Sequence, residues 1–115
     1  MKAYRKCIVC LTAALAALCL ASCDPPTEEE IQAEFNQAVA ASDDCATDAD
    51  CVLVTPGCPL GCGAAVNIEH ETEIRNLAEK LIFEWQLGGN GCDYGCPYMT
   101  AVCTDGTCEA VESSE

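Results

Sequence analysis

The sequence predicts an α+β fold: a small disulfide-rich domain with two helices against a short antiparallel sheet and a C-terminal β-hairpin. Three observations lead to this prediction. Two stretches, one over residues 28–42 and one from Ile74 to Trp85, carry apolar residues at helical spacing. A β-branched run at 52–55 and an Asp-Gly turn near the C-terminus indicate strands. Eight cysteines are distributed among these elements between residues 45 and 108.

The N-terminal segment, residues 1–22, has the pattern of an export signal. Lys2, Arg5 and Lys6 precede Cys7–Leu20, an uncharged apolar run of fourteen residues. A permanent transmembrane helix needs about 20 apolar residues, so this run is short for one. A signal anchor that is never cut is the alternative, but small residues stand where cleavage requires them.

The residues Leu20-Ala21-Ser22-Cys23 close that apolar run. They resemble the lipobox of bacterial lipoproteins. The resemblance implies cleavage before Cys23, a diacylglycerol on its sulfur and a fatty acyl group on its amine. We therefore expect a signal peptide at 1–22, a lipidated tether at 23–27 and a folded domain at 28–115. The protein would be anchored in the bacterial cell envelope, facing the periplasm or the exterior. In enterobacteria an aspartate in the position of Asp24 favours the inner membrane, but the rule varies, and both membranes stay open.

Charge limits the classes of partner. The chain has 5 Lys and Arg against 19 Asp and Glu. Three of the bases precede Cys23, which leaves Arg75 and Lys80 against nineteen acids, a formal net charge of −17. Such a surface repels phosphate backbones, so nucleic acid is excluded as a partner. Contact with a membrane is expected through the lipid anchor rather than through a basic patch.

The first predicted helix, residues 28–42, follows the stiff pair Pro25-Pro26. Thr27 and Glu30 have the spacing of a capping box. An apolar stripe then predicts a face that packs on the domain; it consists of Ile31, Phe35, Ala38 and Val39.

An acidic loop over 43–51 separates this helix from the strand predicted at 52–55. A segment rich in turn residues, 57–63, follows, and a short returning strand is expected at 64–66.

The second helix is the clearest element. Its apolar face comprises Ile74, Leu77, Ala78, Leu81, Ile82 and Trp85. Asn67 or Thr72 is the expected N-cap, Gly88-Gly89 ends the helix, and Glu71 pairs with Arg75. Phe83 and Leu87 project from the opposite side. We expect the first helix to cover them; the alternative is an exposed contact patch.

A hairpin is predicted from 98–103 and 108–111, with Thr104 to Thr107 as its turn and Asp-Gly in the turn centre. This register places Cys103 opposite Cys108, and we expect the hairpin to complete one small antiparallel sheet. A bond between these two cysteines and bonds from them to Cys45 or Cys51 are equally compatible with the register.

The pattern G-C-x-x-G-C occurs twice, at 57–62 and 91–96, once on each side of the second helix. An even number of cysteines in a small exported domain indicates a disulfide framework. The eight expected disulfide cysteines are Cys45, Cys51, Cys58, Cys62, Cys92, Cys96, Cys103 and Cys108. Eight cysteines allow 105 connectivities. Each repeat pairing internally and the two repeats pairing with each other both stay open.

Reactive chemistry is disfavoured. The C-x-x-x-C pairs have a different spacing from thioredoxin-type sites and no neighbouring base, and an oxidising compartment argues against zinc. Asp43, Asp44, Asp48 and Asp50 offer oxygen ligands without the order of a calcium loop. The single histidine, His70, has no recognisable catalytic partner. We therefore predict no enzyme activity, no cofactor and no metal.

The motifs D-x-D-C-V-L-V at 48–54 and A-V-C-x-D-G-x-C at 101–108 resemble small, functionally uncharacterised cysteine-rich proteins secreted by bacteria. That resemblance implies no activity. The favoured hypothesis is a membrane-anchored, non-enzymatic interaction module with a protein partner. The alternatives are an inhibitor of an exported enzyme, presenting a loop at 55–63 or 88–97, and a redox or metal-binding protein.

Overall fold

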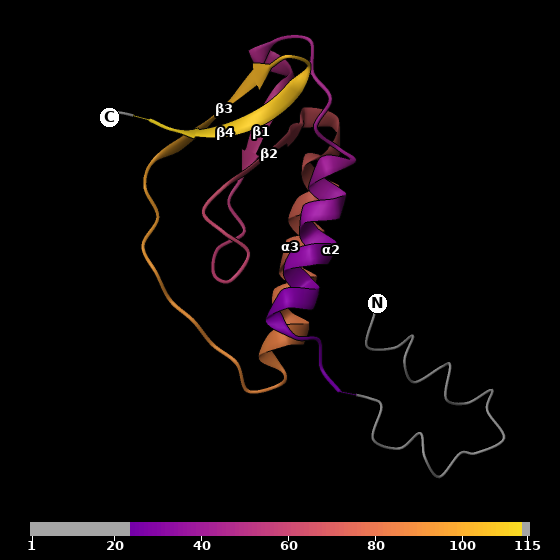
Figure 1. The fold of residues 1–115 in the computed structure, drawn as a ribbon, viewed down its shortest axis with the longest axis vertical. Helices are drawn as coiled ribbons and strands as arrows, with labels where there is room; N and C mark the ends of the chain where they lie inside the picture. The colour runs from indigo at the N-terminus through magenta and orange to yellow at the C-terminus, as the bar shows by residue number, and fades with distance from the viewer. Residues whose placement is uncertain (1–23, 114–115) are drawn as a thin grey trace, which may run out of the picture.

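The computed structural model describes residues 24–113 (Figure 1). The predicted signal peptide, Cys23 and residues 114–115 lie outside the described residues. The elements in chain order are α2 (Glu28–Ala40), the 3-10 helix η2 (Asp48–Asp50), β1 (Cys51–Val54), β2 (Ala64–Asn67), the 3-10 helix η3 (Ile68–His70), α3 (Glu71–Gln86), β3 (Met99–Thr104) and β4 (Thr107–Glu112). None of the helices within residues 24–113 has the length and apolar character needed to span a bilayer.

Helix α2 begins with the predicted capping box. The Thr27 hydroxyl accepts a hydrogen bond from the Glu30 amide at 3.1 Å, and the Glu30 carboxylate accepts one from the Thr27 amide at 2.9 Å. The helix ends at Ala40, two residues earlier than predicted. The reason is tertiary: the Ser42 carbonyl accepts a hydrogen bond from the Asn67 amide at 2.7 Å, which draws the chain toward the end of β2.

Strands β1 and β2 form an antiparallel pair, with Val52 opposite Val66 and Val54 opposite Ala64. The returning strand predicted at 64–66 is therefore confirmed, with Asn67 added. The Asn67 side chain also accepts from the Glu69 amide at 2.9 Å, and this cap starts η3, the single turn that leads into α3. Asn67 therefore caps η3, whereas the N-cap position of α3 itself is His70, so the prediction of Asn67 or Thr72 as the N-cap of this helix is wrong.

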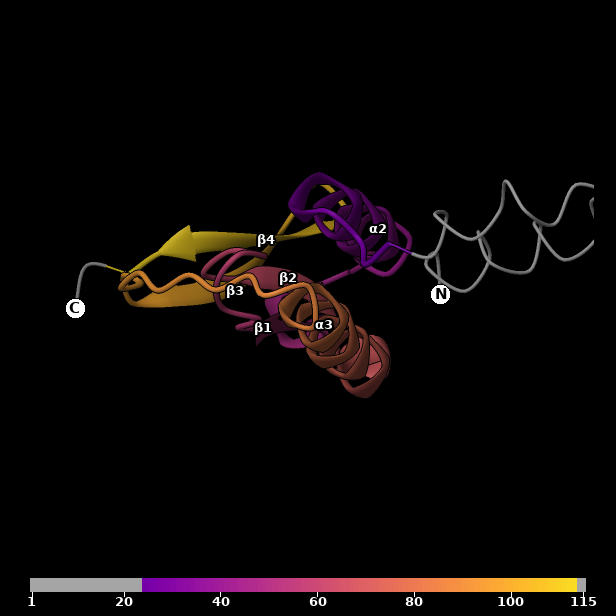
Figure 2. The same ribbon diagram turned by 90° about the horizontal axis from the view of Figure 1, so that it is seen from below.

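Helices α2 and α3 lie side by side and antiparallel (Figures 1 and 2). The Glu71–Arg75 ion pair predicted on α3 is present. The hydrophobic core combines side chains from both helices and from β1 and β2: Ile31, Phe35, Val54, Val66, Ile74, Ala78, Leu81 and Trp85. The apolar stripes predicted for the two helices therefore face a common interior.

The expectation that α2 covers Phe83 and Leu87 is wrong. Their side chains are 61% and 69% exposed. Helix α3 buries Ile74, Ala78, Leu81 and Trp85, so its opposite face is left open to solvent.

The C-terminal hairpin has the predicted register. Cys103 lies opposite Cys108 and Thr104 opposite Thr107. Asp105 and Gly106 both have positive φ, 53° and 81°, as a type I′ turn requires.

The hairpin nevertheless forms its own two-stranded sheet, and the prediction of one sheet is wrong in this respect. The edge of β4 is occupied by the acidic loop that follows α2. The Cys45 amide donates to the Gly106 carbonyl at 3.1 Å, and the Cys108 amide donates to the Asp43 carbonyl at 2.7 Å. These bonds use groups with which β4 would otherwise join a neighbouring strand.

Candidate functional site: the bridged loop

All eight predicted cysteines form disulfides, and each bond joins segments distant in sequence. The pairs are Cys45–Cys103, Cys51–Cys108, Cys58–Cys92 and Cys62–Cys96, with Cα–Cα distances of 6.0, 5.6, 5.9 and 5.4 Å. Cys103 and Cys108 therefore bond to the earlier part of the chain rather than to each other. The two G-C-x-x-G-C repeats bond to one another, and neither C-x-x-x-C pair is bonded internally.

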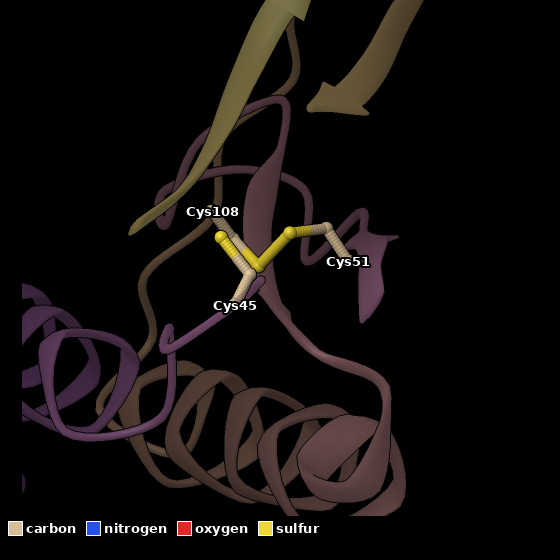
Figure 3. A group of neighbouring side chains, drawn as sticks. All are labelled: Cys45, Cys51 and Cys108. Atoms are coloured by element: carbon tan, nitrogen blue, oxygen red, sulfur yellow. A yellow bond between two sulfur atoms is a disulfide. The ribbon is translucent and has the colours of Figure 1, made fainter. Parts of the chain in front are cut away.

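Two of the disulfides, Cys45–Cys103 and Cys51–Cys108, join the hairpin to the acidic loop and to β1. Figure 3 shows the bond between Cys51 and Cys108 with the Cys45 side chain beside it. The sulfur atoms of Cys45, Cys51 and Cys108 all lie within 4.8 Å of one another, the spacing of a metal-ligand group. Zinc binding requires thiolates, and these sulfurs are all in disulfide bonds. We call Cys45–Cys103 and Cys51–Cys108 the inner bridges.

The other two disulfides, the outer bridges, join the turn at 57–62 to the segment at 91–96. Gly57 and Gly61 adopt positive φ, 87° and 116°, and the Gly57 amide donates to the Gly61 carbonyl at 3.0 Å. This closed turn is fixed to the body of the domain. The Gln32 side chain on α2 donates to the Pro59 carbonyl at 2.9 Å, and Leu60 packs against the core.

Residues 87–98 form a connection that we call the bridged loop. All twelve of its residues are exposed, and it contains no helix or strand. It runs from the end of α3 along one side of the molecule to β3 (Figure 1). At its ends, the Asn90 side chain donates to the Trp85 carbonyl at 3.0 Å and the Ser113 amide donates to the Tyr98 carbonyl at 2.8 Å.

The middle of the bridged loop is joined to the domain by its two disulfides. Among the described residues, no backbone–backbone hydrogen bond involves residues 91–97. Disulfides restrict the conformations of a loop without using its peptide groups. The loop therefore combines a restricted shape with backbone donors and acceptors that a partner can use.

Two tyrosines are the aromatic side chains that this loop presents. Tyr94 lies between the bridged residues Cys92 and Cys96, and Tyr98 follows; both are exposed. Asp93 is the one charged residue within 87–98. Sequence reasoning did not select these tyrosines, although an aromatic residue between two cysteines in a glycine-rich segment was a signal that could have identified them.

The aspartates considered for calcium organise their own loop. The Asp48 carboxylate accepts from the Cys103 amide at 2.7 Å, and the Asp50 carboxylate accepts from the amides of Ala46 and Thr47 at 2.8 and 3.0 Å. These two backbone hydrogen bonds hold the pKa of Asp50 below its ordinary value of 3.8. Asp43 and Asp44 accept hydrogen bonds through their backbone carbonyls.

His70 lies at the surface where η3 meets α3, with Nδ1 3.1 Å from a carboxylate oxygen of Glu73. A contact between side chains three residues apart is common on the surface of a helix. The geometry around His70 therefore adds no reason to assign it a catalytic role.

Comparisons of the chain with protein-family models, curated proteins and solved structures found no match.

Proposed function

We propose that this protein is a lipid-anchored lipoprotein of the bacterial cell envelope, and that its folded domain is a non-enzymatic binding module. The observation that carries the second part is the bridged loop. Exposed loops on rigid scaffolds are common recognition elements, and restricting a loop before binding lowers the entropy lost when a partner docks. Tyr94 and Tyr98 are of the residue type enriched at such interfaces. The lipobox at 20–23 supports the anchor.

The anchor is tested by the intact mass of the protein purified from bacterial membranes. We expect a mature chain beginning at Cys23 that carries a diacylglycerol and four disulfides, and a Cys23→Ser variant that leaves the membrane fraction. Recovery of unmodified Cys23 would contradict the anchor and would leave the binding module standing.

The binding module is tested by capture from envelope extracts with a soluble domain in which Ser replaces Cys23. A partner that binds through the bridged loop is captured by the wild-type domain and lost with the double variant Tyr94→Ala/Tyr98→Ala. Ile68→Ala, an exposed apolar residue on η3, is the matched control and should retain capture. Equal capture by all three domains would exclude the bridged loop as the contact surface.

Inhibition of an exported enzyme is the second candidate function. It is favoured by the backbone of 91–97, which makes no backbone–backbone hydrogen bond within the described residues and can pair with an extended segment of a partner, as in strand addition. A panel of secreted proteases and muramidases tests it. An inhibitor is supported if the wild-type domain lowers the activity of one of these enzymes and the tyrosine double variant does not. No inhibition across the panel would count against it.

A further inference from the structure

The chain that follows the predicted lipidation site is docked on the domain. Pro26 is buried, and Pro25 lies against Gly88 so closely that a β-carbon at Gly88 would stand 2.8 Å from its Cγ. The residues before α2 therefore meet the end of α3, at the shared lower end of the two antiparallel helices in Figure 1. Residues 25 and 26, in the predicted tether, are therefore held against the domain.

Only Asp24 separates Cys23 from this contact. Consecutive Cα atoms are about 3.8 Å apart, so Cys23 lies within roughly 8 Å of Pro25. With the proposed lipid on Cys23, the acyl chains would enter the membrane close to Gly88, because only Asp24 lies between Cys23 and Pro25.

Apolar side chains are exposed at the same end. Leu87 precedes Gly88, and Phe83 lies four residues before Leu87, so the two share one face at the end of α3. They are 69% and 61% exposed.

We propose that Phe83 and Leu87 insert into the lipid interface beside the anchor, so that the domain stands on the membrane by the end of α3. This inference rests on the lipidation of Cys23 in the proposed function. The acyl chains on Cys23 would hold the protein to the membrane, and an adjacent apolar contact would fix which end of the domain faces the lipid.

The acidic charge at this end of the domain determines which lipid headgroups it can approach. Asp24, Glu28, Glu29 and Glu84 are the charged residues within 24–29 and 83–88, and all are acidic. The inserting surface therefore matches zwitterionic headgroups and is repelled by anionic ones.

The opposite end of α3 provides an internal control. Ile68 is 53% exposed and precedes the sixteen residues of α3. At 1.5 Å per residue the helix places Ile68 about 24 Å or more from Leu87. Ile68 should therefore remain in water while Leu87 enters the lipid.

The test uses the full lipidated protein reconstituted into phosphatidylcholine vesicles that contain brominated acyl chains. Leu87→Trp and Ile68→Trp each add one tryptophan to the native Trp85, and the wild type supplies the background. We expect the added fluorescence of Leu87→Trp to shift to the blue and to be quenched at least twofold more than that of Ile68→Trp. Replacing half of the lipid with phosphatidylglycerol should reduce this quenching at low salt.

Equal quenching of the two variants in vesicles that hold the lipidated protein would overturn the inference and leave the anchor intact. Absence of lipid from the protein purified from bacterial membranes would instead contradict the anchor itself. A Phe83→Ser/Leu87→Ser variant gives an independent readout. Its lipidated form should dissociate from vesicles several-fold faster than the wild type, and an unchanged dissociation rate would count against insertion.

Discussion

At the scale of single residues, two aspartates shape the loop between α2 and β1. The Asp50 carboxylate accepts hydrogen bonds from two backbone amides within this loop. The Asp48 carboxylate accepts one from the Cys103 amide and so links the loop to β3. Carboxylates in these positions accept hydrogen bonds from peptide groups in a segment with little regular structure. Their role is to position the inner bridges.

Asp50 should make the stability of the domain depend on pH. Its pKa is lowered by folding, so its contribution is complete above the ordinary value of 3.8 and is lost as the pH falls through the lower folded value. Asp50→Asn should therefore be less stable than the wild type at pH 7, and the difference should disappear near pH 2. Guanidinium unfolding at both pH values measures this. Asp93→Asn is the control, and a difference that persists in acid would contradict the assignment.

Gly88 is required because Pro25 contacts it. Gly88→Ala should lower the free energy of unfolding by roughly 1–3 kcal/mol, the usual cost of overpacking, and Pro25→Ala should relieve part of that loss. Gly91 has no neighbour within 4 Å of an added β-carbon, so Gly91→Ala should be neutral or slightly stabilising. Thermal unfolding of the soluble domain compares them. Equal effects at the two glycines would argue against a docked tether.

At the scale of elements, the local patterns were reliable guides. The capping box of α2 and the turn and register of the hairpin follow from residues within a few positions of one another, so the sequence predicts them. The end of α2 and the separation of the two sheets depend on hydrogen bonds to distant segments, at Asn67 and at 106–108. Local pattern carries no information about those partners.

Of the two phenylalanines in the chain, one lies on a buried helix face and the other on an exposed helix face. Phe35 on α2 is 2% exposed, within the core, so Phe35→Ala should cost about 3–5 kcal/mol. Phe83→Ala on α3 should change stability by less than about 0.5 kcal/mol in the soluble domain. Chemical denaturation gives both values. A large loss at Phe83 would mean that its side chain is covered in solution.

At the scale of the whole molecule, the four disulfides form two sets. The inner bridges join the hairpin to β1 and to the acidic loop, and Cys108 is 5% exposed. The outer bridges connect two irregular segments, and Cys92 and Cys96 are exposed. The domain thus has a compact part and a loop attached to its surface.

The two sets should be reduced in order. Attack on a disulfide requires access to sulfur, so a mild phosphine should open the outer bridges first. Alkylation followed by peptide mass spectrometry should label Cys92 and Cys96 before Cys108, while far-ultraviolet circular dichroism keeps its helical signal. Early labelling of Cys108, or loss of the helical signal with the first bridge, would contradict this order.

The candidate site was only partly predictable. Turn residues and cysteines at 57–62 and 91–96 indicated constrained loops, and the repeated motif indicated a common role. That the repeats bond to each other, and so hold Tyr94 between two bridges, depends on the path of β2 and α3 between them. Sequence spacing cannot distinguish this pairing from internal bonds.

The sequence by itself determined the local features of this protein: where α2 begins, how the hairpin turns, which eight cysteines form disulfides, and the acidic charge. These depend on residue type and short spacing. The tertiary structure decided which cysteines pair, that Phe83 and Leu87 are exposed, and that Pro25 is held against Gly88. The physical reason is that burial and pairing depend on which distant segments meet, and the antiparallel packing of α2 on α3 brings the tether and the end of α3 together.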